Sequence, residues 1–140
     1  MKKIIQQTVS LPARAEKLFA MYLDPAIHEA ITGDKVTISA KEGSVFRAFD
    51  GMVYGKTIAV AHATYIVQLW RGSTWKAEDP DSVLVLNFLL NGEFGTIELT
   101  QVNVPEKDFD NVHEGWQEYY WTPWKDYLEK EQKKTEKRAA

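Results

Sequence analysis

The order of apolar and polar residues in the first quarter of the chain predicts one strand followed by two short helices. Residues 3–9, KIIQQTV, are rich in Ile, Val and Thr, as strands are. The next segment has the i, i+3, i+4, i+7 spacing of one apolar helical face. The residues at that spacing are Ala15, Leu18, Phe19 and Tyr22. Asp24 then has the features of an N-cap and Pro25 those of a first helical residue, so we expect a second helix through Ile31.

Between residues 35 and 104 the chain is a series of β-rich runs separated by turn signals. Isolated glycines and the pairs Asp-Gly, Asp-Pro and Asn-Gly divide the runs. The connections are too short for crossover helices, so the runs predict a meandering antiparallel sheet. The runs are KVTISA, SVFRAF, MVYGKTIAVA, TYIVQLW, SVLVLNFLL and GTIELTQV. Together with the first strand they predict a sheet of six or seven strands.

The last part of the chain predicts one long helix, at about residues 109–131, with an unusual amount of aromatic surface. Its central stretch, GWQEYYWTPWKDYLEK, places aromatic side chains around almost half of the helix. At about 100° per residue, one stripe points toward the sheet and Trp121 lies near the rim of the apolar face. The stripe includes Trp116, Tyr120 and Tyr127. Simple packing on a broad sheet and the roof of an apolar pocket both explain such a helix.

A proline within this helix predicts an irregularity. Pro123 has no N–H for the carbonyl of Tyr119, and its ring presses on the preceding turn. We therefore expect a bend or break at residues 119–123, which lets the two halves of the helix follow a curved sheet.

Composition and charge narrow the class of protein. The 140 residues have a formal net charge of −3, with 26% charged and 44% hydrophobic residues, which is typical of a globular domain. An acidic balance argues against a nucleic-acid groove. The absence of cysteine excludes disulfides and thiolate metal sites, and no apolar run is long enough to span a membrane. We expect a cytoplasmic protein with a single domain at residues 1–131 and a charged, disordered tail at residues 132–140.

Three motifs in this order resemble a known family. They are VFRAFDGMVYGKTIAVAHATYIVQLWRGSTW, then GTIELTQVNVP, then EGWQEYYWTPWKDYL. Together they look like the C-terminal domain of the activator of heat-shock-protein-90 ATPase, in the START-like (SRPBCC) superfamily. The resemblance covers nearly the whole chain. It implies an α+β helix-grip fold, in which a curved antiparallel sheet wraps around a long C-terminal helix and two short helices follow the first strand.

The resemblance also implies three functions, which remain alternatives at this point. The first is noncatalytic binding of a small apolar or amphipathic molecule, because superfamily members hold lipids, hormones or polyketides between sheet and helix. The second is a chaperone-accessory module that acts by protein contact, with a homodimer as a further expectation. Family members that stimulate the chaperone ATPase carry an additional N-terminal domain, and no part of this chain resembles it. The third is a cyclase-type enzyme, for which the sequence offers no convergent acid and base.

The sequence contains no recognisable catalytic or metal motif. Its histidines, His28, His62 and His113, lie far apart and lack the i+3 or i+4 partners of metal-ligand spacings. We therefore assign them surface or structural roles and expect no cofactor, metal or catalytic residue. Asn87 interrupts the apolar run SVLVLNFLL and is either a structural contact or a polar anchor in the pocket. The full set of pocket candidates is Phe46, Tyr54, Trp70, Trp75, Asn87, Trp116 and Tyr120.

Trp116 yields a stability prediction that is the same for every function considered. Truncating a buried aromatic side chain removes its contacts and leaves a cavity, so Trp116→Ala should lower the free energy of unfolding by about 3 to 5 kcal/mol. Urea denaturation of the two proteins measures the difference. A loss below about 1 kcal/mol would show that Trp116 is exposed.

Overall fold

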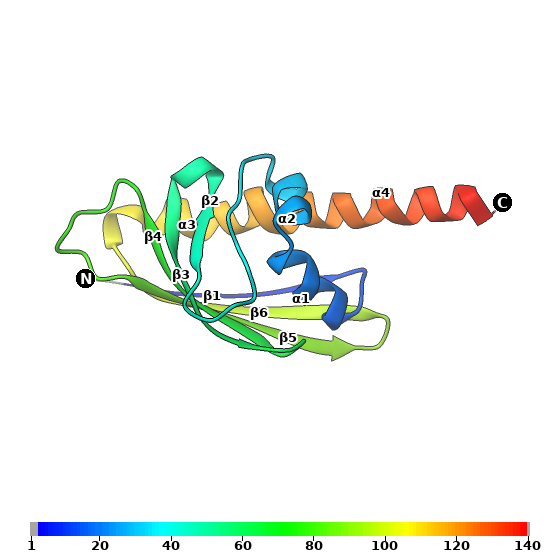
Figure 1. Ribbon diagram of the computed structural model, residues 1–140, viewed down its shortest axis with the longest axis horizontal. Helices are drawn as coiled ribbons and strands as arrows, with labels where there is room; N and C mark the ends of the chain where they lie inside the picture. The colour runs from blue at the N-terminus through cyan, green and yellow to red at the C-terminus, as the bar shows by residue number, and fades with distance from the viewer. Residues whose placement is uncertain (1–2, 140) are drawn as a thin grey trace.

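The computed structural model describes residues 3–139, and it consists of one curved sheet with helices on one side (Figure 1). The six strands are all antiparallel to their neighbours, in the order β1-β6-β5-β4-β3-β2. They are β1 (Lys3–Leu11), β2 (Val45–Ala48), β3 (Val53–Ala61), β4 (Tyr65–Gly72), β5 (Ser82–Asn91) and β6 (Phe94–Val104). This arrangement confirms the predicted fold class.

The helices follow the first strand and the last strand in the chain. Two short helices, α1 (Ala15–Leu23) and α2 (Pro25–Thr32), lie between β1 and β2 as predicted. The side chain of Asp24 caps α2 by accepting hydrogen bonds from the backbone N–H groups of Ala26 and Ile27. The C-terminal helix consists of α3 (Phe109–Trp116), a π-helical turn η3 (Gln117–Trp121) and α4 (Thr122–Ala139). Two 3-10 turns, η1 (Phe49–Gly51) and η2 (Glu106–Asp108), complete the elements.

One predicted strand is wrong. The run KVTISA, residues 35–40, forms only an isolated bridge, in which Thr37 and Arg47 exchange backbone hydrogen bonds of 2.8 and 2.9 Å. Val36 and Ile38 nevertheless point into the core. The apolar alternation there reflects burial beside the edge of the sheet, without a ladder of paired residues.

Strand β3 passes unusually close to β4 at Gly55. A Cβ atom at this position would lie 1.8 Å from the carbonyl oxygen of Leu69. No side chain fits there, so glycine permits the contact between the two backbones.

The C-terminal helix accommodates Pro123 without a break (Figure 1). The irregularity predicted at residues 119–123 takes the form of η3, a widened turn that ends two residues before the proline. A π turn inserts one extra residue, which rotates everything beyond it backward by about 100° relative to a regular helix. The rotation turns Trp121 and Leu128 inward, where both are buried, and leaves Tyr127 only half-buried. The predicted rim position of Trp121 is therefore wrong, whereas Tyr127 packs against the core as a half-buried side chain.

The C-terminal helix also continues further than predicted. α4 extends through Ala139, so residues 132–139 are helical and not the disordered tail predicted from the sequence. Lys, Glu, Gln and Ala all have high helix propensity, and they sustain the helix after its apolar face ends. Its outer turns are tied to the start of α1 by an ion pair between Lys17 and Glu131 and by a hydrogen bond of 2.9 Å from Gln132 to the carbonyl of Pro12.

Candidate functional site

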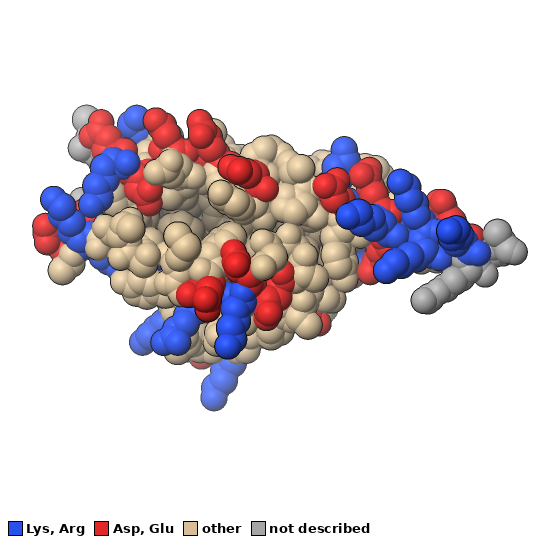
Figure 2. All heavy atoms as spheres, turned by 90° about the horizontal axis from the view of Figure 1, so that it is seen from above, with Lys and Arg blue, Asp and Glu red and all other residues tan. Residues whose placement is uncertain are grey.

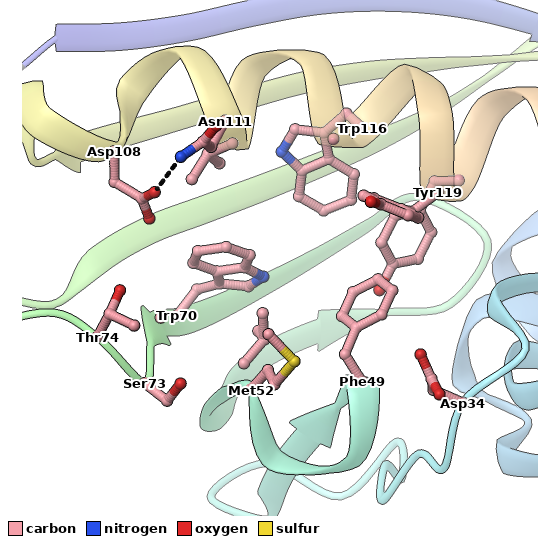
Figure 3. A pocket seen from close by; sticks show the side chains of 15 residues that line it. Asp34, Phe49, Met52, Trp70, Ser73, Thr74, Asp108, Asn111, Trp116 and Tyr119 are labelled. Carbon is pink, nitrogen blue, oxygen red and sulfur yellow. Dashed lines mark hydrogen bonds between the residues drawn. The ribbon is translucent and has the colours of Figure 1, made fainter.

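A pocket of about 390 Å³ lies between the C-terminal helix and the β3–β4 side of the sheet (Figure 3). The helix forms its roof, β4 forms its floor, and η1 with the loop after β4 forms its mouth. Figure 2 shows this face of the molecule, with a hollow in the surface. The lining residues are Asp34, Phe49, Met52, Val53, Trp70, Gly72, Ser73, Thr74, Asp108, Asn111, Val112, Gly115, Trp116, Tyr119 and Tyr120.

Aromatic rings form most of the inner wall. The Trp116 ring lies 6.4 Å from that of Trp70 and 4.7 Å from that of Tyr120, measured between centroids. Phe49 closes the opposite side, with its ring edge-to-face against Tyr120 at 5.8 Å and against Tyr119 at 5.7 Å. Rings fixed by one another in this way hold a cavity open better than flexible aliphatic chains would.

The turn that carries Phe49 has an unusual backbone conformation. Phe49 and Asp50 both have positive φ, at 53° and 54°, and Gly51 follows at 92°. A left-handed conformation is rare for a bulky side chain and has a cost in free energy. The turn therefore needs support from the surrounding structure, and the ring contacts of Phe49 with the C-terminal helix provide it.

Four of the five tryptophan side chains donate a hydrogen bond from the indole N–H, and Trp70 does not. Trp75 donates to Asp108 at 2.7 Å, and Trp116 donates to the amide oxygen of Gln101 at 2.9 Å. Trp121 donates to Gln7 at 2.7 Å, and Trp124 approaches the Met21 sulfur at 3.5 Å. Trp70 Nε1 is buried, but no described residue accepts a hydrogen bond from it. A buried donor left unpaired costs about 1 to 3 kcal/mol. Ser44 Oγ is the other buried side-chain atom in this condition within the described part of the chain, and Ser44 does not line the pocket.

A layer of buried polar side chains lies on the inner face of the sheet. The Gln101 amide donates to Ser82 at 3.0 Å, and the Ser82 hydroxyl donates to the carbonyl of Trp70 at 2.6 Å. Beside this chain, Tyr22 donates to Gln68 at 2.7 Å, and Gln68 donates to Thr57 at 3.1 Å. These fully buried groups are paired, so the layer fixes the side chains above it without leaving donors for a ligand.

His28 is buried beneath the C-terminal helix. Its Nδ1 lies 2.7 Å from the carbonyl oxygen of Tyr22, which can only accept, so Nδ1 carries the proton. Its Nε2 therefore accepts the hydrogen bond of 2.9 Å from the Tyr120 hydroxyl. Burial lowers the pKa of His28 to about 4, although the bond to the Tyr22 carbonyl favours the protonated ring. Burial also raises the pKa of Tyr120 and that of Tyr22. Both ring nitrogens of His28 are occupied and no carboxylate bonds to them, which argues for the structural role predicted for this residue.

The charged residues at the pocket are acidic. Asp34 and Asp108 line it, and none of the described lining residues is Lys or Arg. Figure 2 shows several acidic side chains around the hollow. Asp108 accepts hydrogen bonds from Trp75 and, at 3.2 Å, from Asn111. No group of three His, Cys, Asp or Glu side chains within residues 3–139 has the arrangement of a metal site.

The structure brings three of the seven pocket candidates together at the pocket. They are Trp70, Trp116 and Tyr120. Phe46 is fully buried in the core, and Trp75 packs behind Trp70 with ring centroids 5.7 Å apart. Tyr54 and Asn87 belong to the outer row of their strands, because Val53 on β3 and Leu86 and Phe88 on β5 face the core.

Several pocket residues were not identified from the sequence. Phe49, Met52 and Tyr119 had no distinguishing pattern, and Asp34, Asp108 and Asn111 lie in segments that read as ordinary turns and helix starts. The adjacent pair Asp50-Gly51 signalled a turn, but nothing in it indicates that Phe49 also adopts positive φ.

Comparison with known sequences gives a family match. The sequence profile described as "Activator of Hsp90 ATPase homolog 1-like protein" matches residues 12–129. The chain is 27% identical over 107 residues to the activator of 90 kDa heat shock protein ATPase homolog 1 of Homo sapiens, which covers 76% of this chain and 31% of that protein. The chain spans only 23% to 35% of the length of the curated relatives it matches.

Solved structures share the fold. An HSP90 activator from Plasmodium falciparum superposes with a TM-score of 0.81 at 19% sequence identity, covering 89% of this chain and 95% of that one. The Aha1 dimer from Colwellia psychrerythraea gives a TM-score of 0.74 at 11% identity, covering 86% and 92%. No helix in the described part of the chain is long and apolar enough to cross a membrane.

The buried His28 predicts a loss of stability in mild acid. The unfolded chain takes up a proton at this side chain near pH 6.5, whereas the folded protein resists protonation until about pH 4. The unfolded state binds more protons in between, so stability should fall as the pH is lowered through this window, by about 3 kcal/mol from this group. Urea denaturation from pH 7 to pH 4 measures it. His28→Gln should remove that part of the pH dependence, while His62→Gln, at an exposed position, should keep it. Equal pH dependence in wild type and His28→Gln would contradict the assignment.

Proposed function

Because the chain belongs to the family of Activator of Hsp90 ATPase homolog 1-like proteins, whose fold can enclose a cavity, we propose that it binds a small apolar or amphipathic molecule noncatalytically. One observation carries this proposal: an aromatic-walled pocket of about 390 Å³ stays open beneath the C-terminal helix. Such a volume lies in the lower part of the roughly 300 to 1,000 Å³ typical of ligand sites.

The arrangement of side chains supports binding over catalysis. A reaction by general acid–base catalysis needs a titratable group with a free position facing the substrate. His28 has both nitrogens engaged beneath Tyr120, and burial raises the pKa of Tyr120. The carboxylates that line the pocket are Asp34 and Asp108, and Asp108 already accepts hydrogen bonds from Trp75 and Asn111, so the cyclase-type alternative has the weaker support.

Gly115 allows a direct test of the pocket. It lines the roof, and a Cβ atom there would meet only the Tyr119 ring at 3.6 Å, an ordinary contact. Gly115→Leu should therefore fold while filling the pocket, and Gly115→Ala is the matched control. We expect the uncharged fluorescent probe N-phenylnaphthylamine to bind the wild type with one site. Its affinity should fall about tenfold or more in Gly115→Leu and by less than about threefold in Gly115→Ala.

Two binding results with these proteins would contradict the proposal. Equal binding by wild type and Gly115→Leu would place the probe elsewhere and overturn the proposal. Absence of binding to a folded wild-type protein would do the same. Native mass spectrometry of the purified protein adds an independent observation, since a copurified molecule should be present in the wild type and missing from Gly115→Leu.

A second candidate function is that of a chaperone-accessory module. The names of the human relative and of the Plasmodium falciparum structure describe activators of the 90 kDa heat shock protein and support this alternative. The tip of the β5–β6 hairpin also exposes apolar side chains, with Leu90 65% and Phe94 48% exposed. Exposed apolar side chains at the end of a sheet are available for protein contacts.

Chaperone contact is tested by the ATPase rate of a purified 90 kDa heat shock protein with and without this chain. We expect the rate to rise on addition of the wild type and the rise to be reduced several-fold by Leu90→Glu, because a charge at an apolar contact is costly to bury. Ile58→Glu, on the outer face of β3, is the control and should leave the rise unchanged. No change of rate and no binding with the wild type would exclude this function.

Two further expectations remain proposals. The Colwellia psychrerythraea relative is a dimer, which supports the proposal that this chain forms a homodimer. A cytoplasmic location is proposed from the sequence, in keeping with the absence of cysteine.

A further inference from the structure

We infer that the molecule bound in this pocket is uncharged or cationic and carries a hydrogen-bond acceptor, such as a carbonyl oxygen, to which the indole N–H of Trp70 donates. This inference rests on the proposed binding function and adds the chemical class of the ligand. It follows from two independent features of the pocket. One is a buried hydrogen-bond donor without an acceptor, and the other is that the charged residues lining the pocket are acidic.

The donor is the first feature. Trp70 lines the pocket and is only 6% exposed, and its Nε1 has no acceptor among the described residues. Figure 3 shows this nitrogen turned toward Met52 and Phe49, into the space enclosed by the lining side chains. The other four indoles use their N–H groups within the protein. Trp70 is therefore the tryptophan whose donor capacity is left for a ligand.

The direction of this donor is fixed before a ligand binds. The Trp70 ring lies between those of Trp75 and Trp116, and its carbonyl accepts the hydrogen bond from Ser82. An acceptor that binds there does not have to order the ring, so little conformational entropy is lost.

Met52 is the side chain best suited to admit the acceptor. It lines the pocket near the mouth and is 65% exposed. Methionine is unbranched and has three rotatable bonds, so it moves aside at low cost. We therefore expect Met52 to cover the buried Nε1 in the free protein and to repack against the bound molecule.

The charges are the second feature. Asp34 and Asp108 line the pocket, with no Lys or Arg among the described lining residues. A carboxylate or phosphate entering this apolar space would lose its hydration and approach like charges without a cationic partner. An uncharged acceptor avoids both penalties, and a cationic group at the mouth would gain from the two carboxylates.

Three naphthalene probes separate these requirements. Acetylnaphthalene has an uncharged acceptor, ethylnaphthalene has nearly the same shape without one, and naphthoate is an anion. Isothermal titration gives the dissociation constant of each for wild type, Trp70→Phe and Trp124→Phe. The last variant loses an indole N–H in the same core but does not line the pocket.

We expect the preference of the wild type for acetylnaphthalene over ethylnaphthalene to fall about tenfold in Trp70→Phe and to stay unchanged in Trp124→Phe. Naphthoate should bind the wild type at least about tenfold more weakly than acetylnaphthalene. A Trp70→Phe variant that weakens both uncharged probes by the same factor would overturn the role of the donor. Naphthoate binding as tight as that of acetylnaphthalene would overturn the charge requirement.

The wild-type measurements keep the inference testable even if a variant does not fold, because the comparison of probes uses one protein. They also distinguish this inference from the proposed function. If Gly115→Leu blocks N-phenylnaphthylamine while the three naphthalenes bind the wild type equally, the pocket binds ligands and the inferred chemistry is wrong. If neither N-phenylnaphthylamine nor any naphthalene binds the wild type, the proposed function itself fails.

Discussion

The residue inserted by the π-helical turn η3, just before Pro123, sets the geometry on which the rest of the molecule depends. In a regular helix of this sequence, Trp121 and Leu128 would lie about 100° away from the buried position that both adopt. The extra residue of η3 rotates the second half of the helix, and both Trp116 before the turn and Trp124 after it are buried. Pro123 favours this solution, since its ring would clash with the carbonyl of Tyr119 in a regular turn. The pocket lies under α3 and η3, and α4 packs on α2.

The polar layer on the sheet complements this helix. Amide side chains of Gln7 and Gln101 accept the indole N–H groups of Trp121 and Trp116, so the sheet fixes the orientation of rings on the helix above it. Buried networks of this kind stabilise a fold only when their members are satisfied, because each unpaired group costs more than a hydrogen-bonded pair contributes. At the pocket, the indole N–H of Trp70 is buried without an acceptor. Unsatisfied groups in an otherwise consistent core are expected at functional sites.

The sequence predicted the structure best where a pattern of residues fits only one kind of element. Turn residues and short connections indicated the antiparallel order of the strands, and the spacing of apolar residues indicated α1. The pattern was ambiguous in β5, whose run SVLVLNFLL is apolar on both rows, so Asn87 was considered for the pocket although it lies on the outer row. The predicted position of Trp121 is wrong because a constant rotation of about 100° per residue around the helix axis cannot represent an inserted residue. The partners of His28 come from distant segments, and no local motif marks them.

The tryptophans form one continuous series through the core. Neighbouring ring centroids lie 5.6 to 6.4 Å apart. The series runs in the order Trp75, Trp70, Trp116, Trp121 and Trp124. Indoles this close exchange excitation energy, so the intrinsic fluorescence of the protein is a collective property and no single ring accounts for it. Two members of the series face the pocket, and the light emitted from the far end of the core therefore depends on the surroundings of the pocket wall.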